Sequence, residues 1–327
     1  RPTGEGESID EMLAAHTEWW KDFWLRCWVD LNDPLLERYY YGAQYVHGCS
    51  IDLGGRVVPG LAGGWITNDA PIWGGTYTMN YNGESPFWGL ASSNRGEWLL
   101  PYARVCLDYI QPGRALAKRL DTKGIVMPVM IGPWGIPDND DALGQKSNAS
   151  MAALSLIWHY ESTRDRKFLE EILYPYLREL MDFWEDNLEL DESGRYIIIG
   201  SARERNPGDL NPSEDLAYVR RILDVMIPAS RELGRDGDRR DAWLDYQARL
   251  SDYPVANEDG NFCFKEAENR MKISHHGVGD NVCALNAVYP GGGIDHDPSG
   301  KGKIIARNTL RYLKSWNQAN SFTRVFP

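Results

Sequence analysis

Several features that would identify common protein classes are missing from this chain. It has five cysteines, an odd number, and none is paired at metal-site spacing, so neither a disulfide framework nor a zinc module is indicated. No apolar run approaches the roughly 18 residues that a membrane-spanning helix needs. The phosphate-binding loop, the serine-hydrolase elbow G-x-S-x-G and the zinc motif H-E-x-x-H are also missing. The sequence therefore predicts no membrane span and none of these enzyme classes.

Positive charge is scarce as well. The chain has 35 Lys and Arg residues against 47 Asp and Glu residues, which gives a net charge of -12. Nucleic-acid-binding proteins usually have the opposite balance. We therefore expect no nucleic-acid partner.

Aromatic residues that carry a polar atom are abundant. The chain has 13 Trp and 17 Tyr but only 8 Phe. Trp and Tyr combine an apolar face with a hydrogen-bonding group. Two interpretations stay open from composition alone: a core rich in aromatic side chains, or a cleft that binds sugars.

Helical periodicity dominates the chain. We expect helices over 8–30, 34–44, 145–163, 166–188, 213–233, 238–250, 278–288 and 302–315, and a further helical pattern over 84–110. Ser8 and Glu11 predict a capping box, and Asp33 before Pro34 predicts an N-cap with a first-turn proline. Gly234 is expected to end the helix over 213–233.

The pattern favours an all-α toroid of helical hairpins, with function in the loops at one end. Only a short strand is expected, over 196–199, and the Gly-rich stretch 54–82 is interpreted as a long ordered loop. We interpret 1–327 as one domain. Because the chain stops in an apolar segment, Ser321–Pro327, the toroid is expected to lack its final hairpin.

The long loop contains the first group of candidate site residues. Trp65 and Trp73 stand beside glycines, which let the backbone approach a ligand, and both rings could stack on a sugar. If residues 78–82 are extended, Asn80 and Asn82 point the same way and together could orient a water molecule. The alternative is a turn in which both amides bond to the backbone.

The second group follows the short strand. Glu204 lies between Arg203 and Arg205. A carboxylate between two arginines is usually ionised and structural, whereas a general acid needs a raised pKa. Both roles stay open for Glu204 from the residues alone. The adjacent pair His275 and His276 is less favoured as a metal site, because neighbouring side chains on a helix point about 100° apart.

These residues together resemble the catalytic domain of glycoside hydrolase family 95, the α-L-fucosidases and α-L-galactosidases. The resemblance covers roughly residues 55–315. The motifs that carry it, in the family's order and spacing, are Gly64-Trp65, Pro71-Ile-Trp73-Gly-Gly-Thr-Tyr77-Thr-Met-Asn80-Tyr-Asn82, Trp158-His-Tyr160 with Thr163, Asp165, Phe168 and Leu169, Tyr174-Pro175, and Ser193-Gly-Arg-Tyr196.

The resemblance implies an (α/α)6 toroid and inverting, exo-acting hydrolysis of an α-linked L-fucose or a galacto-configured sugar. It implies that Glu204, with Asn206 close behind, is the general acid, and that Asn80 and Asn82 position the attacking water. It also implies that His275 or His276, ahead of Tyr289-Pro-Gly, binds the sugar. The substrate-binding set is then Trp65, Trp73, Trp134, His275, His276 and Asn206.

The chain departs from the family pattern in three places. The acid segment reads Arg203-Glu-Arg-Asn206 in place of the usual Pro-flanked form, and Met130–Gly135, with Trp134, replaces a histidine-containing segment. The family's catalytic Asp is expected beyond Pro327. Asp295 and Asp297 are the nearest loop carboxylates, but they align with the Tyr-Pro-Gly turn.

We therefore predict a glycosidase that needs no metal or cofactor and acts on a glycan, without a nucleic-acid or membrane partner. The alternatives are a non-catalytic or degenerate carbohydrate-binding domain, and another (α/α)6 glycosidase or polysaccharide lyase. The expected compartment is secreted, periplasmic or cell-surface, with the cytoplasm as the alternative. The sequence does not specify the sugar, its linkage or the oligomeric state.

Overall fold

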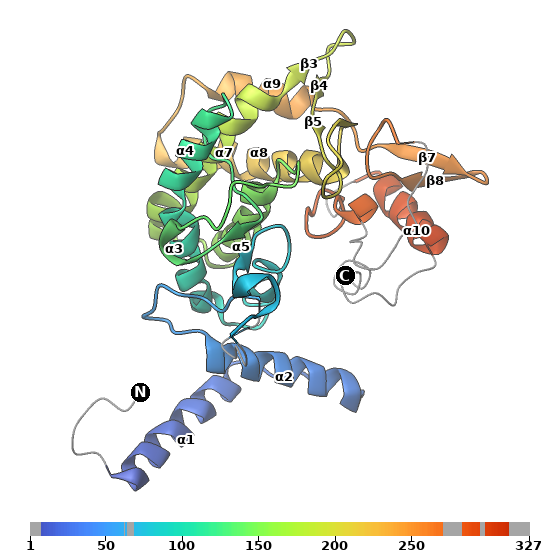
Figure 1. Cartoon of the computed structure of the whole chain (residues 1–327). Coiled ribbons are helices and arrows are strands. Elements are labelled where there is room, and N and C mark those ends of the chain that lie inside the picture. The colour runs from blue at the N-terminus through green and yellow to red at the C-terminus, as the bar shows by residue number, and fades with distance from the viewer. Residues whose placement is uncertain (1–7, 62, 64–68, 271–282, 295–297, 314–327) are drawn as a thin grey trace.

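The computed structural model describes residues 8–61, 63, 69–270, 283–294 and 298–313, most of them in or between helices (Figure 1). The α-helices are α1 (Ile9–Leu25), α2 (Pro34–Ser50), α3 (Leu100–Asp108), α4 (Ile110–Arg119), α5 (Asn148–Thr163), α6 (Arg166–Phe168), α7 (Tyr174–Asn187), α8 (Ser213–Leu233), α9 (Arg240–Arg249) and α10 (Lys301–Leu313). A π-helical turn, Leu169–Leu173, joins α6 to α7. None of the described helices has the length and apolar character that a bilayer crossing requires.

The strands are short, and each pairs antiparallel with one other strand. The pairs are β1 (Tyr77–Thr78) with β2 (Met130–Ile131), β3 (Glu189–Leu190) with β4 (Tyr196–Ile197), β5 (Ile199–Gly200) with β6 (Asp209–Leu210), and β7 (Val255–Glu258) with β8 (Asn261–Phe264). Each pair fixes the position of a loop. β1 and β2 bring together segments more than 50 residues apart, because Tyr77 lies opposite Ile131.

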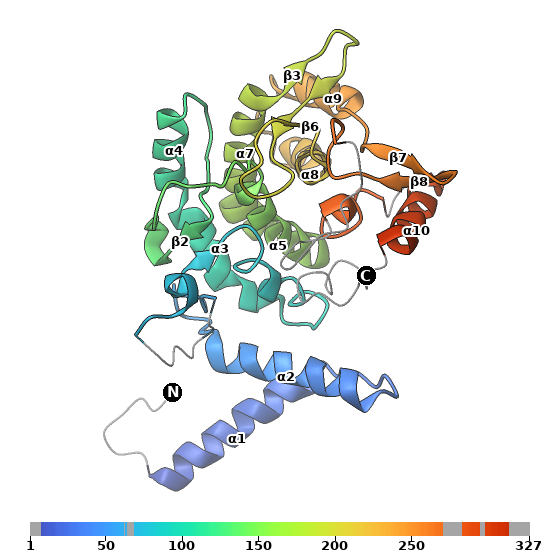
Figure 2. The same ribbon diagram turned by 45° about the vertical axis from the view of Figure 1, so that its right-hand side comes forward.

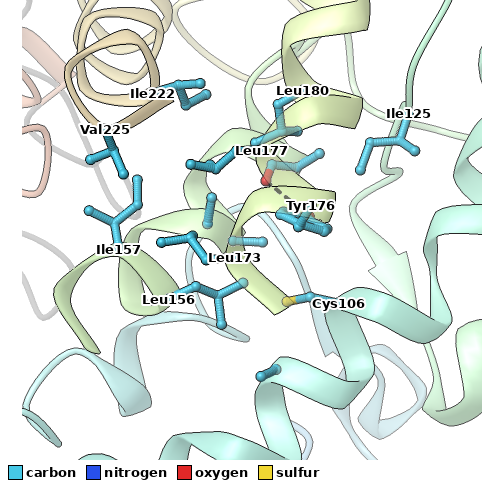
Figure 3. Close-up of a cluster of buried hydrophobic side chains, with 14 of the residues drawn as sticks. Cys106, Ile125, Leu156, Ile157, Leu173, Tyr176, Leu177, Leu180, Ile222 and Val225 are labelled. Carbon is cyan, nitrogen blue, oxygen red and sulfur yellow. Dashed lines mark hydrogen bonds between the residues drawn. The ribbon is translucent and has the colours of Figure 1, made fainter. Parts of the chain in front are cut away.

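The core forms where α5, α7 and α8 meet. Figure 3 shows side chains of these helices gathered in one cluster, among them Leu156, Leu177 and Ile222, which are fully buried. Two buried aromatic side chains bind α5 through their polar atoms: the Tyr176 hydroxyl donates to the Ala149 carbonyl at 3.1 Å, and the Trp184 indole donates to Ser150 Oγ at 3.0 Å. α5 is therefore held on several faces, as expected for a helix that is apolar almost all round.

Local signals at the helix ends are confirmed. Ser8 and Glu11 form both bonds of the capping box, and the Asp33 side chain accepts from the first turn of α2. Gly234 ends α8 with a left-handed φ of 64°. The expected helices agree with α1, α2, α5, α6 with α7, α8, α9 and α10, although α1 ends earlier, at Leu25, and α2 continues to Ser50.

One expected element is wrong, and one observed element was not expected. The helical pattern over 84–110 is divided into the 3-10 turns Ser85–Phe87 and Gly96–Leu99 followed by α3, and α4 begins where it was expected to end. The β7–β8 hairpin is an element that the sequence did not predict. The expected helix 278–288 falls outside the described residues up to 282, and a 3-10 turn occupies Cys283–Leu285.

α1 and α2 lie apart from the main group of helices in both views (Figure 1, Figure 2). One of their links to the body is the buried Phe23: Arg95 stacks its guanidinium over that ring at 4.1 Å and donates to the Phe23 carbonyl at 2.8 Å. Trp19 of α1 is 45% exposed, whereas Trp184 of α7 is fully buried. The aromatic excess therefore belongs only partly to the core.

Consecutive helices of the body pack on one another. α3 contacts α4 and α5, α7 contacts α8, and α8 contacts α9. This arrangement of helical pairs agrees with the predicted all-α class. Closure into a complete (α/α)6 ring stays a prediction, as does the single domain over 1–327.

Candidate active site

The two asparagines lie on a turn and not on an extended strand. β1 ends at Thr78, and the Gly83 amide closes the next residues by donating to the Thr78 carbonyl at 2.7 Å. Residues 78–82 are therefore not extended, so the condition under which alternation would place Asn80 and Asn82 on one side is not met. Asn80 is buried, while Asn82 is partly exposed.

Asn80 contacts Glu204 across 124 residues of sequence. Its amide nitrogen donates one bond to Glu204 Oε1 at 2.8 Å and another to Gln145 Oε1 at 3.0 Å. The structure thus brings together the two residue types that the sequence singled out separately. Gln145 was not predicted, because nothing in the sequence links it to either residue.

One of the two arginines beside Glu204 faces elsewhere. The guanidinium of Arg203 forms an ion pair with Glu266, with Nε to Oε2 at 2.8 Å. The amide of Arg205 donates to the Leu143 carbonyl at 2.6 Å. Within the described residues neither arginine forms an ion pair with Glu204, so the interpretation of a carboxylate held between two arginines is wrong. The Glu204 side chain is exposed.

The loop that carries Glu204 is anchored at its far end as well. Asp209, on β6, accepts the Ala202 amide at 2.8 Å and forms a two-fold ion pair with Arg270, each bond 2.9 Å long. Asn206 turns its carbonyl oxygen toward the same guanidinium, at 3.1 Å from Arg270 Nη1. Asn206 therefore contacts an anchor of the loop, and its role in sugar binding stays a prediction.

Trp73 and Trp134 lie on neighbouring turns at one end of the β1–β2 pair, and Asn80 follows the other end. Both rings are largely exposed, at 57% and 56%. Both residues have a left-handed backbone, with φ of 50° and 58°, which is uncommon for a bulky side chain. Exposed aromatic faces on rigid turns are suited to stacking, but the short ladder separates them from the Asn80–Glu204 contact. Trp65, His275 and His276 lie outside the described residues, as do Asp295 and Asp297.

Three acids on or beside the segments that carry this contact are buried. Glu214 and Asp215 occupy the first turn of α8, where the sequence indicates only a favourable helix end. Asp215 is 1% exposed and accepts a bond from Ser147. Burial raises the pKa of its carboxyl to about 7. Glu84, four residues after Asn80, is completely buried, and burial raises its pKa as well.

Among the residues that the structure describes, no three His, Cys, Asp or Glu side chains gather in a way that could hold a metal ion. The Asn80–Glu204 contact itself contributes one carboxyl group and the amides of Asn80 and Gln145. A carboxyl group can donate or accept a proton, and an amide can orient a water or a hydroxyl.

The family model of the glycosyl hydrolase family 95 catalytic domain matches residues 15–320. The chain belongs to this family. The expected resemblance is thereby confirmed. No curated protein matches the chain significantly.

Among solved structures, the chain is similar to a protein described as a kojibiose phosphorylase from the human microbiome, with a TM-score of 0.59 and 12% identity. The match covers 76% of this chain but only 38% of that one. At this identity the likeness concerns the fold, and it supports the assignment of the body to the α/α class.

Proposed function

We propose that this family 95 domain is an inverting, exo-acting glycosidase that removes an α-linked L-fucose or a galacto-configured sugar, with Glu204 as its general acid. In this reaction Glu204 protonates the leaving oxygen while a water attacks the anomeric carbon from the opposite face. The observation that carries the assignment is the hydrogen bond between Asn80 and Glu204, because it joins the two family motifs at one point.

The contact also limits how Asn80 can act. Its Nδ2 donates to Glu204 Oε1, so this oxygen accepts a hydrogen bond and does not carry the proton that the acid delivers. The proton that Glu204 delivers must then be carried by Oε2. We infer that Asn80 orients Glu204, and that Asn82 and the Asn80 carbonyl oxygen remain for the attacking water. Trp73 and Trp134 would contact sugar units farther from the cleaved bond.

The test is a panel of nitrophenyl glycosides, including α-L-fucoside and α-L-galactoside, with the anomer of the released sugar followed by NMR. An α-linked donor that gives β-product supports inversion. Glu204→Gln should lower turnover by about 100-fold to 10,000-fold on substrates with poor leaving groups. Glu192→Gln, at an exposed turn, is the matched control and should keep wild-type turnover. Unchanged turnover of Glu204→Gln would exclude this acid.

A non-catalytic carbohydrate-binding domain is the second candidate, and the solvent exposure of the Glu204 side chain favours it. Measurable sugar binding without turnover would support this role.

The panel is run with and without inorganic phosphate, because the structural neighbour is described as a phosphorylase. In phosphorolysis the C–O bond to the leaving group breaks, phosphate oxygen bonds to the anomeric carbon, and the acid's proton passes to the leaving oxygen. A sugar 1-phosphate product would replace hydrolysis as the proposed reaction.

A further inference from the structure

The first turn of α8 connects the segments that form the candidate site. The Ser213 amide donates to the Glu266 carbonyl at 2.8 Å, and Glu266 is the residue that pairs with Arg203. Glu214 accepts a bond from the Asn286 amide. This turn therefore contacts both the support of the Glu204 loop and the segment around Asn286.

Asp215 reaches the segment that supports Asn80. One of its carboxyl oxygens accepts from the hydroxyl of Ser147, which is fully buried. Ser147 stands two residues after Gln145, whose side chain accepts the second amide hydrogen of Asn80. Ser147 occupies the N-cap position of α5 but forms no capping bond there. Its hydroxyl is committed to Asp215 instead.

The other oxygen of Asp215 reaches the strand that leads to Glu204. A methyl group at Gly200, on β5, would overlap Asp215 Oδ2. This oxygen is buried and has no hydrogen-bond partner among the described residues. Glu204 follows Gly200 by four residues, on a loop whose far end is anchored by Asp209. The carboxyl group of Asp215 thus fills the space between the two supports.

We propose that Asp215 is a positioning residue: its carboxyl group, wedged between Ser147 and Gly200, sets the separation of Asn80 and Glu204. The kinetic consequence rests on the proposed function, because it assumes that Glu204 is the acid. Asp215 is buried beneath the loop and acts through its neighbours, so it is not itself a catalytic residue. A small displacement of an acid from its substrate can cost about 100-fold in rate.

Three substitutions test this role separately. Asp215→Ala removes both contacts, and Ser147→Ala removes only the hydroxyl donor. Gly200→Ala pushes on the carboxyl group from the other side, at a position whose φ is not left-handed. Asp215→Asn keeps the volume and an oxygen acceptor for Ser147, and is the conservative rescue.

The measurement compares two glycosides with the same sugar, one with a poor leaving group and one with a dinitrophenyl group, which needs no protonation. Asp215→Ala and Gly200→Ala should lower kcat on the poor leaving group by about tenfold or more, with little change in KM. On the dinitrophenyl substrate the loss should be under about threefold. Asp215→Asn should recover most of the difference.

Glu179→Gln is the matched control, because Glu179 is another buried carboxylate, on α7, paired with Arg114 away from the site. A purely structural defect lowers the folded fraction and slows both substrates equally. An equal loss on both substrates, or wild-type rates in Asp215→Ala, would overturn the positioning role.

A second readout does not depend on activity. Crystal structures of the wild type and of Asp215→Ala give the distance from Asn80 Nδ2 to Glu204 Oε1, which is 2.8 Å here. If the wild type turns over none of the glycosides, the proposed function fails, but this comparison of distances still tests the positioning role of Asp215. A bond kept in Asp215→Ala contradicts the positioning role, and a separation beyond hydrogen-bonding distance supports it.

Discussion

The buried carboxyl group of Asp215 makes the stability of the protein depend on pH in a direction that can be calculated. Burial is the largest cause that raises its pKa, from 3.8 to about 7. The charged groups around it are Glu214 on the same helix, Lys146 before α5 and Asp209 on β6. The two acids raise the pKa further, whereas Lys146 and the Ser147 hydroxyl lower it. The perturbation that isolates this group is Asp215→Asn, which is neutral at every pH.

The sign follows from proton binding. Between about pH 4 and pH 7 the unfolded chain has lost the Asp215 proton while the folded protein keeps it, so stability falls as pH rises through this window. Above about pH 7 the Asp215 carboxyl group is ionised in both the folded and the unfolded state, and its destabilising effect on the folded state is constant. The pKa difference corresponds to about 4 kcal/mol of unfolding free energy at 1.36 kcal/mol per pKa unit. Asp215→Asn carries no ionisable group at this position, so it lacks this destabilisation.

The assay is urea unfolding followed by tryptophan fluorescence at pH 4 and pH 8, for the wild type and Asp215→Asn. Subtracting the two proteins cancels every group that they share. We expect the variant to gain up to about 4 kcal/mol relative to the wild type between these pH values. Glu179→Gln should instead lose stability at pH 8, because it breaks the ion pair with Arg114. A difference between wild type and Asp215→Asn that is independent of pH would refute the reasoning.

Three further predictions concern other parts of the molecule. Gly124→Ala should cost about 3 kcal/mol or more in urea unfolding, since φ is 65° and a methyl group would overlap backbone atoms of α7. Gly194→Ala, at φ 83° in open space, should cost only about 1–2 kcal/mol, and equal losses would contradict this account. Trp73→Ala and Trp134→Ala should raise KM for an oligosaccharide more than for a nitrophenyl monosaccharide, whereas equal effects would place these rings at the cleaved sugar. Asn80→Ala should slow poor leaving groups by about tenfold or more and spare a dinitrophenyl leaving group, and equal slowing would assign Asn80 to the water instead.

The sequence predicts the helices well where local chemistry decides their ends. The Ser8–Glu11 box, the Asp33 cap and Gly234 act within a few residues, and each appears in the structure. The pattern fails over 84–110, where apolar residues recur at helical spacing. Buried Phe87, Trp88 and Trp98 there lie on or beside 3-10 turns, because tertiary packing overrides the local preference.

The candidate site could be predicted as a set of residues but not as an arrangement. Asn80 and Glu204 were identified from separate motifs, and their contact depends on how β1 and the β5–β6 loop are placed by the body. Arg203 stands next to Glu204 in sequence yet pairs with Glu266, because backbone order does not fix side-chain direction. The sequence did not predict that the Asp215 side chain is buried. Its one local signal is the apolar run that follows it, Leu216–Val219.

The Asn80–Glu204 contact also restricts how a sugar can enter. At 2.8 Å the two side chains leave no space for a sugar ring between them. Inversion places the attacking water on the sugar face opposite the acid, with the base carboxylate roughly 6.5–9.5 Å from the acid. Since both Nδ2 hydrogens of Asn80 are already used, this side chain can meet the water only through its carbonyl oxygen, as an acceptor. A water held in that way still needs a base to take its second proton, and Glu204 cannot supply that function while it serves as the acid.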